Sequence, residues 1–188
     1  MLTPSQLLDL GCGSLRGGVH FVRFLDPHKY FGLDINPHLL DAGYERELVP
    51  LGLAPKLPRS HLAASADFDA SDFGQTFDYV LSVSVWTHLP LSAVEESMRK
   101  VADVLAPTGR FYATYFRCPE EAPLSTPIVQ YAEGMERIVT YGDRDWFHHK
   151  DSALRDTAHR AGLRMRVIGD WGHPRSQLML EFTLDGEE

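Results

Sequence analysis

The run from Leu7 to Ser14 constrains the fold of this chain most strongly, because apolar residues pass straight into a turn with two glycines. Its sequence, LLDLGCGS, predicts a buried parallel strand followed by a tight loop. Gly11 and Gly13 lack a Cβ, so they permit positive φ angles and a close approach of the backbone to a ligand. Two more glycines at 17–18 extend the loop, and an apolar helical stretch follows at 19–25. The pattern indicates the first half of a nucleotide site, although a plain strand–loop–helix connection would also produce it.

A second apolar run, from Tyr30 to Ile35, contains an acid at the expected distance from the glycine loop. Asp34 lies 21 positions after Gly13. In nucleotide-binding α/β folds an acid about 20 residues beyond the loop binds the ribose, since the second parallel strand ends beside the first. Asp34 could instead cap the next helix, but Asn36 followed by a proline already provides that start signal. The spacing therefore favours a ribose-binding carboxylate.

The loop sequence also narrows the choice of nucleotide. The dinucleotide fingerprint needs a third glycine at position 16, where this chain has Arg16. The Gly-Lys-Ser/Thr of phosphate-binding loops is absent, and so is the Tyr-x-x-x-Lys pair of short-chain dehydrogenases. An NAD-type oxidoreductase is therefore a less favoured alternative.

Several segments resemble the motifs of class I S-adenosylmethionine-dependent methyltransferases. Residues 9–13 (DLGCG) are similar to the first motif, 32–35 (GLDI) to the second and 66–68 (ADF) to the third, while 77–84 and 101–116 resemble the strands and helix that follow. The family's third loop glycine falls here at Leu15, so the loop is a variant. The resemblance extends over residues 5–184. It implies an α/β, Rossmann-like methyltransferase fold with a seven-stranded, mostly parallel sheet, helices on both faces, and S-adenosyl-L-methionine as cofactor.

The resemblance further implies which residues contact the cofactor. Asp34 would bind the ribose hydroxyls, and Asp67 with the following backbone amide would read the adenine. Cys12 would serve as a small apolar residue inside the glycine loop. The complete set of implied cofactor-binding residues is Asp9, Gly11, Cys12, Gly13, Asp34, Ile35, Ala66, Asp67, Phe68 and Ser84.

Length and composition predict a single domain over residues 1–188. Hydrophobic residues make up 44% of the chain, enough for a sizeable core, and the net charge of −8 argues against a nucleic-acid partner. No apolar run is long enough to span a membrane, and no signal peptide is visible, so we expect a cytoplasmic protein. The two cysteines, Cys12 and Cys118, have no metal-binding spacing.

Strand-like and helix-like segments alternate along the chain, which predicts a parallel sheet covered by helices on both faces. Ser92 with Glu95 three positions later predicts a capping box at the start of the third helix. Gly109 and Gly162 stand where a helix should pass into a strand. The expected strands are 6–10, 30–35, 60–65, 79–85, 109–116, 163–168 and 177–184, and the expected helices are 19–25, 37–49, 91–105 and 150–161.

A long connection with three prolines, residues 117–143, follows the fifth strand on the ligand side of such a sheet. Connections of this length are uncommon unless they are functional or partly disordered. We expect an acceptor-pocket or lid insertion here, with a surface excursion as the alternative.

Three histidines are candidates for a catalytic base, because imidazole changes its charge near neutral pH. His88 lies just after the fourth strand, and His148 and His149 precede the last helix. Each could instead be structural, by orienting a loop or by starting the helix. Before the last strand, His173 has the neighbours expected of a structural or rim residue, and Arg175 could pair with an anionic acceptor.

Missing motifs narrow the acceptor. The chain lacks the Asn/Asp-Pro-Pro-Tyr/Phe sequence of amino-group methyltransferases, and no acid pair with a nearby asparagine suggests a divalent metal. We therefore expect methyl transfer to a small-molecule acceptor, at a hydroxyl oxygen and without a metal. Only residues 1–5 precede the first strand, so the cofactor site is open, or a partner subunit of a homodimer covers it, or the chain is truncated. A non-catalytic or weakly active S-adenosylmethionine-binding module is then the alternative function.

Overall fold

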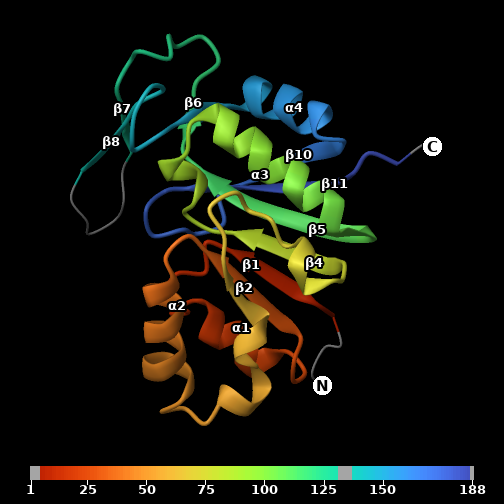
Figure 1. Cartoon of the computed structure of the whole chain (residues 1–188). Coiled ribbons are helices and arrows are strands. Elements are labelled where there is room, and N and C mark those ends of the chain that lie inside the picture. Colours follow the sequence, from red (N-terminus) through yellow and green to blue (C-terminus); the bar gives the residue numbers. More distant parts are fainter. Residues whose placement is uncertain (1–4, 131–136, 187–188) are drawn as a thin grey trace.

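A seven-stranded sheet forms the centre of the computed structural model, which describes residues 5–130 and 137–186 (Figure 1). Its strands are β1 (Leu7–Leu10), β2 (Tyr30–Asp34), β3 (Leu62–Ala64), β4 (Phe77–Ser82), β5 (Leu105–Tyr115), β10 (Leu163–Gly169) and β11 (Leu178–Leu184). They lie in the order β10-β11-β5-β4-β1-β2-β3. Neighbours are parallel except at β11, which is antiparallel to both β10 and β5. The predicted fold class, a mostly parallel Rossmann-like sheet with seven strands, is confirmed.

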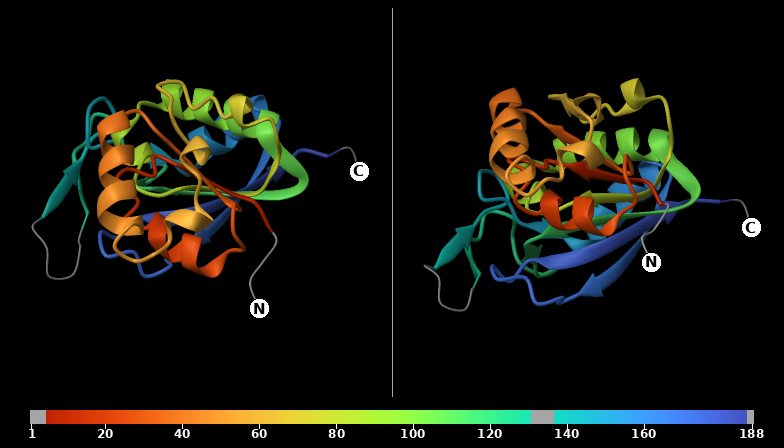
Figure 2. Two further views of the ribbon diagram at one scale, coloured as in Figure 1. Left: turned by 60° about the horizontal axis from the view of Figure 1, so that its bottom comes forward. Right: turned by 90° about the horizontal axis from the view of Figure 1, so that it is seen from below.

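Helices cover both faces of the sheet (Figure 2). They are α1 (Gly18–Phe24), α2 (Pro37–Gly43) with its π-helical continuation (Tyr44–Leu48), α3 (Leu91–Val104) and α4 (Asp151–Arg160). The apolar residues of α1 and α2 pack in one core cluster, and those of α3 and α4 pack in another on the opposite face. The segment predicted as one helix over 37–49 is helical from Pro37 to Leu48, but its second half is wound more loosely.

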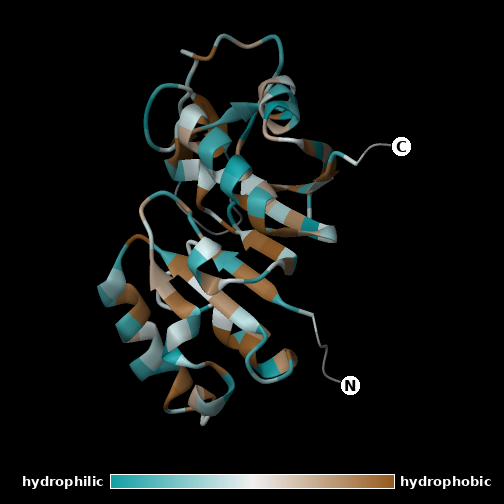
Figure 3. Ribbon diagram, turned by 45° about the vertical axis from the view of Figure 1, so that its right-hand side comes forward, coloured by the Kyte–Doolittle hydropathy of each residue, from teal (hydrophilic) through white to brown (hydrophobic). Residues whose placement is uncertain are grey.

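The central strand β1 is buried on both faces, which explains its continuous apolar sequence. Leu8 and Leu10 belong to the cluster under α3 and α4, whereas Leu7 belongs to the cluster under α1. Successive side chains of a strand point to opposite faces, so both faces need apolar residues here. Each fully buried leucine stabilises the fold by about 1.5–3 kcal/mol. Figure 3 shows this pattern as hydrophobic strands between helices of mixed character.

The start of α3 differs from the predicted capping box, which was wrong. Pro90 is the N-cap residue, the helix begins at Leu91, and no side chain caps it. Ser92 lies inside the helix, and Glu95 forms ion pairs with two arginines instead of closing a cap. Because the ring of Pro90 fixes its φ, the chain enters the helix two residues before the predicted cap.

The two glycines predicted at helix–strand junctions differ in outcome. Gly162 follows α4 with a φ of +73°, as a helix-ending glycine should. Gly109, in contrast, lies within β5, because α3 passes directly into that strand at Leu105. A Cβ at Gly109 would lie 2.8 Å from the carbonyl oxygen of Phe77, so close strand packing explains this glycine.

The segment 117–143 contains short strands rather than an irregular loop. They are β6 (Arg117–Cys118), β7 (Ile128–Gln130) and β8 (Ile138–Thr140), and β6 pairs with β9 (His149–Lys150). β7 and β8 form an antiparallel hairpin that projects beyond the sheet on the side of α2 (Figure 1). Residues 131–136 of this segment lie outside the described residues. Within the described ranges, no helix combines the length and apolar character needed to cross a membrane.

Candidate functional site

Two cavities that share Gly11 lie at the carboxyl ends of β1, β2 and β4. The larger cavity has a volume of about 520 Å³ and the smaller about 340 Å³. The larger is lined mainly by residues that follow β2, β3 and β4, namely Asp34, Ile35, Leu39, Ser65, Ala66, Phe68, Ser84, Val85, His88 and Leu89. The smaller is lined by the glycine loop and the start of α1, including Asp9, Cys12, Gly13, Ser14, Arg16 and Phe21. An elongated ligand with two chemically different ends would fit such a pair of cavities.

Gly11 and Gly13 give the loop between the cavities its shape. Both have positive φ angles, +71° and +54°, which side chains rarely adopt. A Cβ at Gly11 would also lie 2.4 Å from Cγ2 of Val85. The loop can therefore follow its path only with glycine at position 11.

Asp34 connects three segments around the larger cavity. Its Oδ2 accepts a hydrogen bond from the Gly13 amide at 2.8 Å, and its Oδ1 accepts one from the Asn36 amide at 2.9 Å. The alternative role as a helix cap belongs to Asn36, whose side chain accepts from the amide of His38. Each carboxylate oxygen of Asp34 keeps a further lone pair, so the group can still accept hydrogen bonds from a ligand.

Asp9 and Arg16 provide opposite charges on the wall of the smaller cavity. Asp9 is almost fully buried, and its Oδ2 accepts a hydrogen bond from the Tyr30 hydroxyl at 2.6 Å. Burial above all, with the nearby charge of Asp34, raises the pKa of Asp9 to about 6, while the hydrogen bond from Tyr30 partly opposes this shift. Arg16, the residue that breaks the dinucleotide fingerprint, faces the same cavity. A carboxylate with a guanidinium is the complement of an α-amino acid, which carries both an ammonium and a carboxylate.

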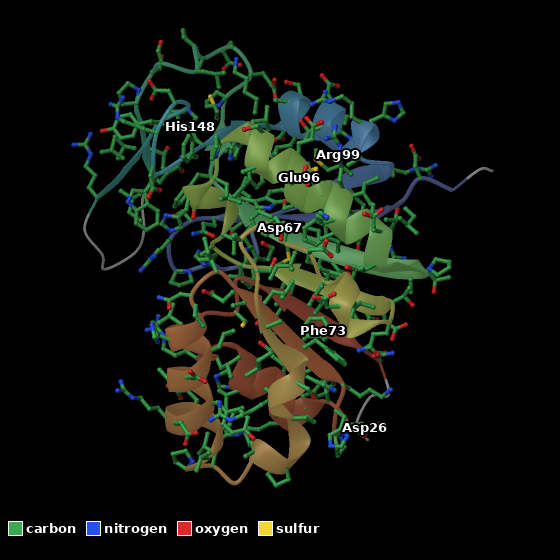
Figure 4. All side chains as sticks on the ribbon, in the orientation of Figure 1. Asp26, Asp67, Phe73, Glu96, Arg99 and His148 are labelled. Carbon is green, nitrogen blue, oxygen red and sulfur yellow. The ribbon has the colours of Figure 1, made fainter. Side chains whose placement is uncertain are left out.

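The residues after β3 divide between two neighbouring hollows. Ala66 and Phe68 line the larger cavity, and Phe68 has a φ of +63°. Asp67 does not line it: its carboxylate accepts a hydrogen bond from the Ser65 hydroxyl at 2.8 Å and faces an adjacent hollow (Figure 4). The Ser65 hydrogen bond, followed by the amide of Asp69, lowers the pKa of Asp67 below its ordinary value. Its predicted contact with adenine would require the side chain to turn.

Ser84, at the exit of β4, belongs to a buried polar cluster that the sequence did not reveal. Its amide donates to Thr114 Oγ1 at 2.8 Å, and its hydroxyl donates to Gln177 Oε1 at 3.0 Å. Thr114 also donates to Gln177, whose Nε2 has no partner among the described residues. Ser84 and Gln177 are 93 positions apart, so no spacing rule connects them. The cluster fixes the loop that forms one wall of the larger cavity.

His88 is the one predicted base that lines the larger cavity. Its Nδ1 lies 2.9 and 3.1 Å from the two carboxylate oxygens of Asp145, and its ring lies 4.5 Å from that of Trp146. With Nδ1–H donating to a carboxylate, the neutral ring keeps its lone pair on Nε2. Asp145 was not among the predicted residues, because it lies 57 positions away in the loop between β8 and β9.

His148 and His149 lie in the core and line neither cavity. His148 contacts the Thr140 hydroxyl through Nδ1 at 3.0 Å (Figure 4), and His149 donates from Nε2 to the Trp86 carbonyl at 3.2 Å. Burial lowers the pKa of His149 to about 4 and lowers that of His148 as well. The structure therefore does not bring these two histidines together with His88 and the cofactor-binding residues.

Taken together, the antiparallel last strand, the glycine loop and the acid that ends β2 define the class of S-adenosylmethionine-dependent methyltransferases. Residues 8–111 match the family model described as "Methyltransferase domain". This match covers more than half of the chain, so the protein belongs to that family.

Solved methyltransferase structures share this fold at low sequence identity. An S-adenosylmethionine-dependent methyltransferase from Clostridium acetobutylicum has a TM-score of 0.69 and 13% identity, over 98% of this chain and 86% of that chain. CcbJ from Streptomyces caelestis has a TM-score of 0.69 and 14% identity, over 97% and 90%. Magnesium protoporphyrin IX methyltransferase from Synechocystis, solved with bound S-adenosylmethionine, has a TM-score of 0.64 and 14% identity, over 95% and 69%. At this identity the neighbours show the fold alone; the family match makes the protein a methyltransferase, a class whose methyl donor is S-adenosylmethionine.

The paired cavities fit this cofactor. Asp9 and Arg16 complement the charges of its methionine end, and Asp34 offers oxygen acceptors for ribose hydroxyls. Ile35, with 71% of its surface exposed, and Phe68 give the larger cavity apolar surface for a base. Gly11 lines both cavities, and a Cβ there would collide with Val85 on the wall of the larger one.

Proposed function

We propose that the protein transfers the methyl group of S-adenosylmethionine to a hydroxyl oxygen of a small molecule, with His88 as the general base. The observation that carries this proposal is the His88–Asp145 pair on the wall of the larger cavity. A base is needed when the acceptor is a hydroxyl, which is a poor nucleophile while it keeps its proton. An amine or a thiolate would need no such pair.

S-adenosylmethionine supplies, when bound, a methyl group activated by a positively charged sulfur. His88 receives the hydroxyl proton at Nε2, because its Nδ1–H is held by the carboxylate of Asp145. That carboxylate also stabilises the imidazolium that forms. The acceptor oxygen bonds to the methyl carbon, the carbon–sulfur bond breaks, and S-adenosylhomocysteine leaves. The walls of the cavity hold the acceptor in line for this displacement.

A small acceptor is supported by the dimensions and charge of the molecule. The larger cavity is of a size for a cofactor end and a small molecule, and the chain carries a net charge of −8, which disfavours nucleic acid. Magnesium protoporphyrin IX, named for one structural neighbour, is itself a small molecule. A cytoplasmic location and a homodimer remain predictions from the sequence.

The replacement His88→Gln tests the proposal, because glutamine can hydrogen-bond but cannot accept a proton. We expect transfer to slow by about 10²- to 10⁴-fold, measured as S-adenosylhomocysteine release with a panel of phenols and sugars. Binding of S-adenosylmethionine, measured by calorimetry, should stay unchanged. Asp145→Asn should cause a smaller loss, since the ring keeps its place but loses the charge beside it.

His20→Gln is the matched control, because His20 is an exposed histidine on α1. It should leave both transfer and binding unchanged. Unchanged transfer in the His88→Gln protein would overturn the role of His88. Cofactor binding without transfer to any compound of the panel would favour the alternative, a non-catalytic S-adenosylmethionine-binding module.

A further inference from the structure

Three residues from two segments lie near His88 or near Ser84 on the wall of the larger cavity. Together with His88 we call them the acceptor rim: His88, Trp146, His173 and Arg175. The Trp146 ring lies 4.5 Å from the His88 ring, and the Arg175 guanidinium lies 5.7 Å from the same Trp146 ring. Trp146 therefore neighbours both the proposed base and a cation. A small acceptor that touches His88 is within reach of Arg175.

The rim is joined directly to the wall of the cofactor cavity. Ser84 lines that cavity, and its hydroxyl lies 3.5 Å from His173 Nε2. The backbone amide of Arg175 donates to His173 Nδ1 at 3.1 Å, which fixes the backbone of the arginine. Trp171 donates from its ring nitrogen to the Gln177 carbonyl at 3.1 Å, so both ends of this loop are held. The guanidinium is thus carried by a loop that its own hydrogen bonds preorganise for binding.

Arg175 is half-buried, and among residues 5–130 and 137–186 it forms no ion pair. Arg144, by contrast, also lies over an aromatic ring, that of Tyr141, but is paired with the carboxylate of Asp143 at 3.2 Å. The carboxylate of Asp145 is already engaged by His88. In a chain with a net charge of −8, a cation without a carboxylate partner beside the active site is a free binding group for an anion.

We propose that the acceptor is a small hydroxylated acid, whose anionic group binds Arg175 while its hydroxyl faces His88. This substrate class rests on the proposed hydroxyl transfer, since it assigns the second end of the same acceptor. A carboxylate matches the planar guanidinium through two parallel hydrogen bonds, and a phosphate monoester offers the same chemistry. Trp146 would contact the body of the acceptor between these two ends.

The test compares acceptors that share a phenol and differ in the group opposite it, an anion or a neutral ester: 4-hydroxybenzoate, 4-hydroxyphenyl phosphate and methyl 4-hydroxybenzoate, with a wider panel of hydroxy acids and their esters. We expect transfer to acids, at a lower KM than to their neutral partners. Arg175→Gln should raise the KM for the acids about 10- to 100-fold, remove the preference over esters, and leave kcat nearly unchanged. Arg175→Lys should restore part of the preference. The compound whose KM rises more in Arg175→Gln, the carboxylate or the phosphate, identifies the natural anion.

Arg144→Gln is the control, since this arginine of a neighbouring loop already has a carboxylate partner; it should leave every KM unchanged. Preferred transfer to the neutral esters would overturn the anion site and leave the hydroxyl transfer intact. An equal loss of kcat for acids and esters in Arg175→Gln, or a loss of cofactor binding, would show a structural arginine and also overturn it. Cofactor binding without transfer to any acid or ester would overturn both proposals together.

Discussion

At the scale of single residues, Asp34 has a double task. Its carboxylate holds the amides of Gly13 and Asn36 and still faces the cofactor cavity. Asp34→Ala should weaken S-adenosylhomocysteine binding by about 1–3 kcal/mol, because ribose hydroxyls and two amides would lose their acceptor. Calorimetry measures this change, with circular dichroism to verify the fold. Asp103→Ala, at an exposed aspartate of α3, is the control and should bind normally; a normal affinity for Asp34→Ala would remove Asp34 from the site.

We predict that Asp9 makes cofactor binding depend on pH. Burial raises its pKa from an ordinary value of 3.8 to about 6, so the carboxylate becomes protonated as the pH falls below 6. Tyr30, Cys12 and Asp34 also face it, and the pKa values of the tyrosine and cysteine are raised, so both remain neutral. A cationic ammonium would favour the ionised carboxylate, and its affinity should therefore fall by up to tenfold per pH unit below 6.

Calorimetry with S-adenosylhomocysteine at pH 7.5 and pH 5 checks this second prediction. We expect a dissociation constant about tenfold higher at pH 5 for the natural protein, and little pH dependence for Asp9→Asn. Equal constants at both pH values in the natural protein would mean that Asp9 is not opposite the ammonium.

At the scale of elements, the glycine loop offers a matched pair of substitutions. Gly11→Ala places a Cβ at a φ of +71° and 2.4 Å from Val85, whereas Gly17→Ala meets nothing within 4 Å and keeps a helical φ of −81°. We expect Gly11→Ala to lower both cofactor affinity and the free energy of unfolding, the latter by about 1–3 kcal/mol. Gly17→Ala should leave affinity unchanged and stability within about 0.5 kcal/mol. Urea unfolding and calorimetry distinguish the two; similar behaviour would contradict the geometry of the loop.

Elements with strong local signals were predictable from the sequence. The apolar run of β1 follows from its burial on both faces of the sheet. The spacing to Asp34 follows because neighbouring parallel strands end side by side. Both predictions depend only on residues that are close in the sequence. The cap of α3 was not predictable in the same way, because Pro90 and the serine two residues later compete for one boundary. The split of residues 37–48 into α- and π-helical turns also depends on packing, since Gly43 lies against the backbone of Ser14.

At the scale of the whole molecule, the acceptor side was the part that sequence reasoning could not assemble. The pairs His88–Asp145 and Ser84–Gln177 join residues 57 and 93 positions apart. Their contacts depend on how the loop between β8 and β9 and the loop after β10 fold back over the sheet. Neither loop has a periodic pattern of apolar residues. The residues predicted for the cofactor come from consecutive strand–loop–helix units, and all of them except Asp67 line the two cavities.

The buried histidines make the stability of the whole molecule sensitive to acid. Burial lowers the pKa of His149 from an ordinary value of 6.5 to about 4, so the folded state favours the neutral ring. Its contribution is complete above pH 6.5 and is lost as the pH falls towards 4, by about 3 kcal/mol in total. His148, the neighbouring residue, also has a pKa lowered by burial and adds to the same trend.

Urea unfolding at pH 7 and pH 5 measures this effect. His149→Gln keeps a donor for the Trp86 carbonyl but cannot be protonated, so its unfolding free energy should change less between the two pH values. His20→Gln, at an exposed site, should show the same change of unfolding free energy between the two pH values as the natural protein. If the unfolding free energy changes equally with pH in the natural protein and in His149→Gln, then His149 is not the source of the acid sensitivity.

The sheet separates the two binding sites along the chain, because β4 and β1 lie side by side at its middle and β5 follows β4. This order has a consequence for how the molecule can diversify. Every residue proposed for the cofactor comes from the chain up to Ser84, whereas the residues proposed for the acceptor, apart from His88, come from beyond β5. Apart from His88, the residues proposed to bind the two ligands are thus encoded by different stretches of the gene. Exchanging 117–150 and 169–177 between relatives could retarget the enzyme to a new molecule while the donor side is inherited intact.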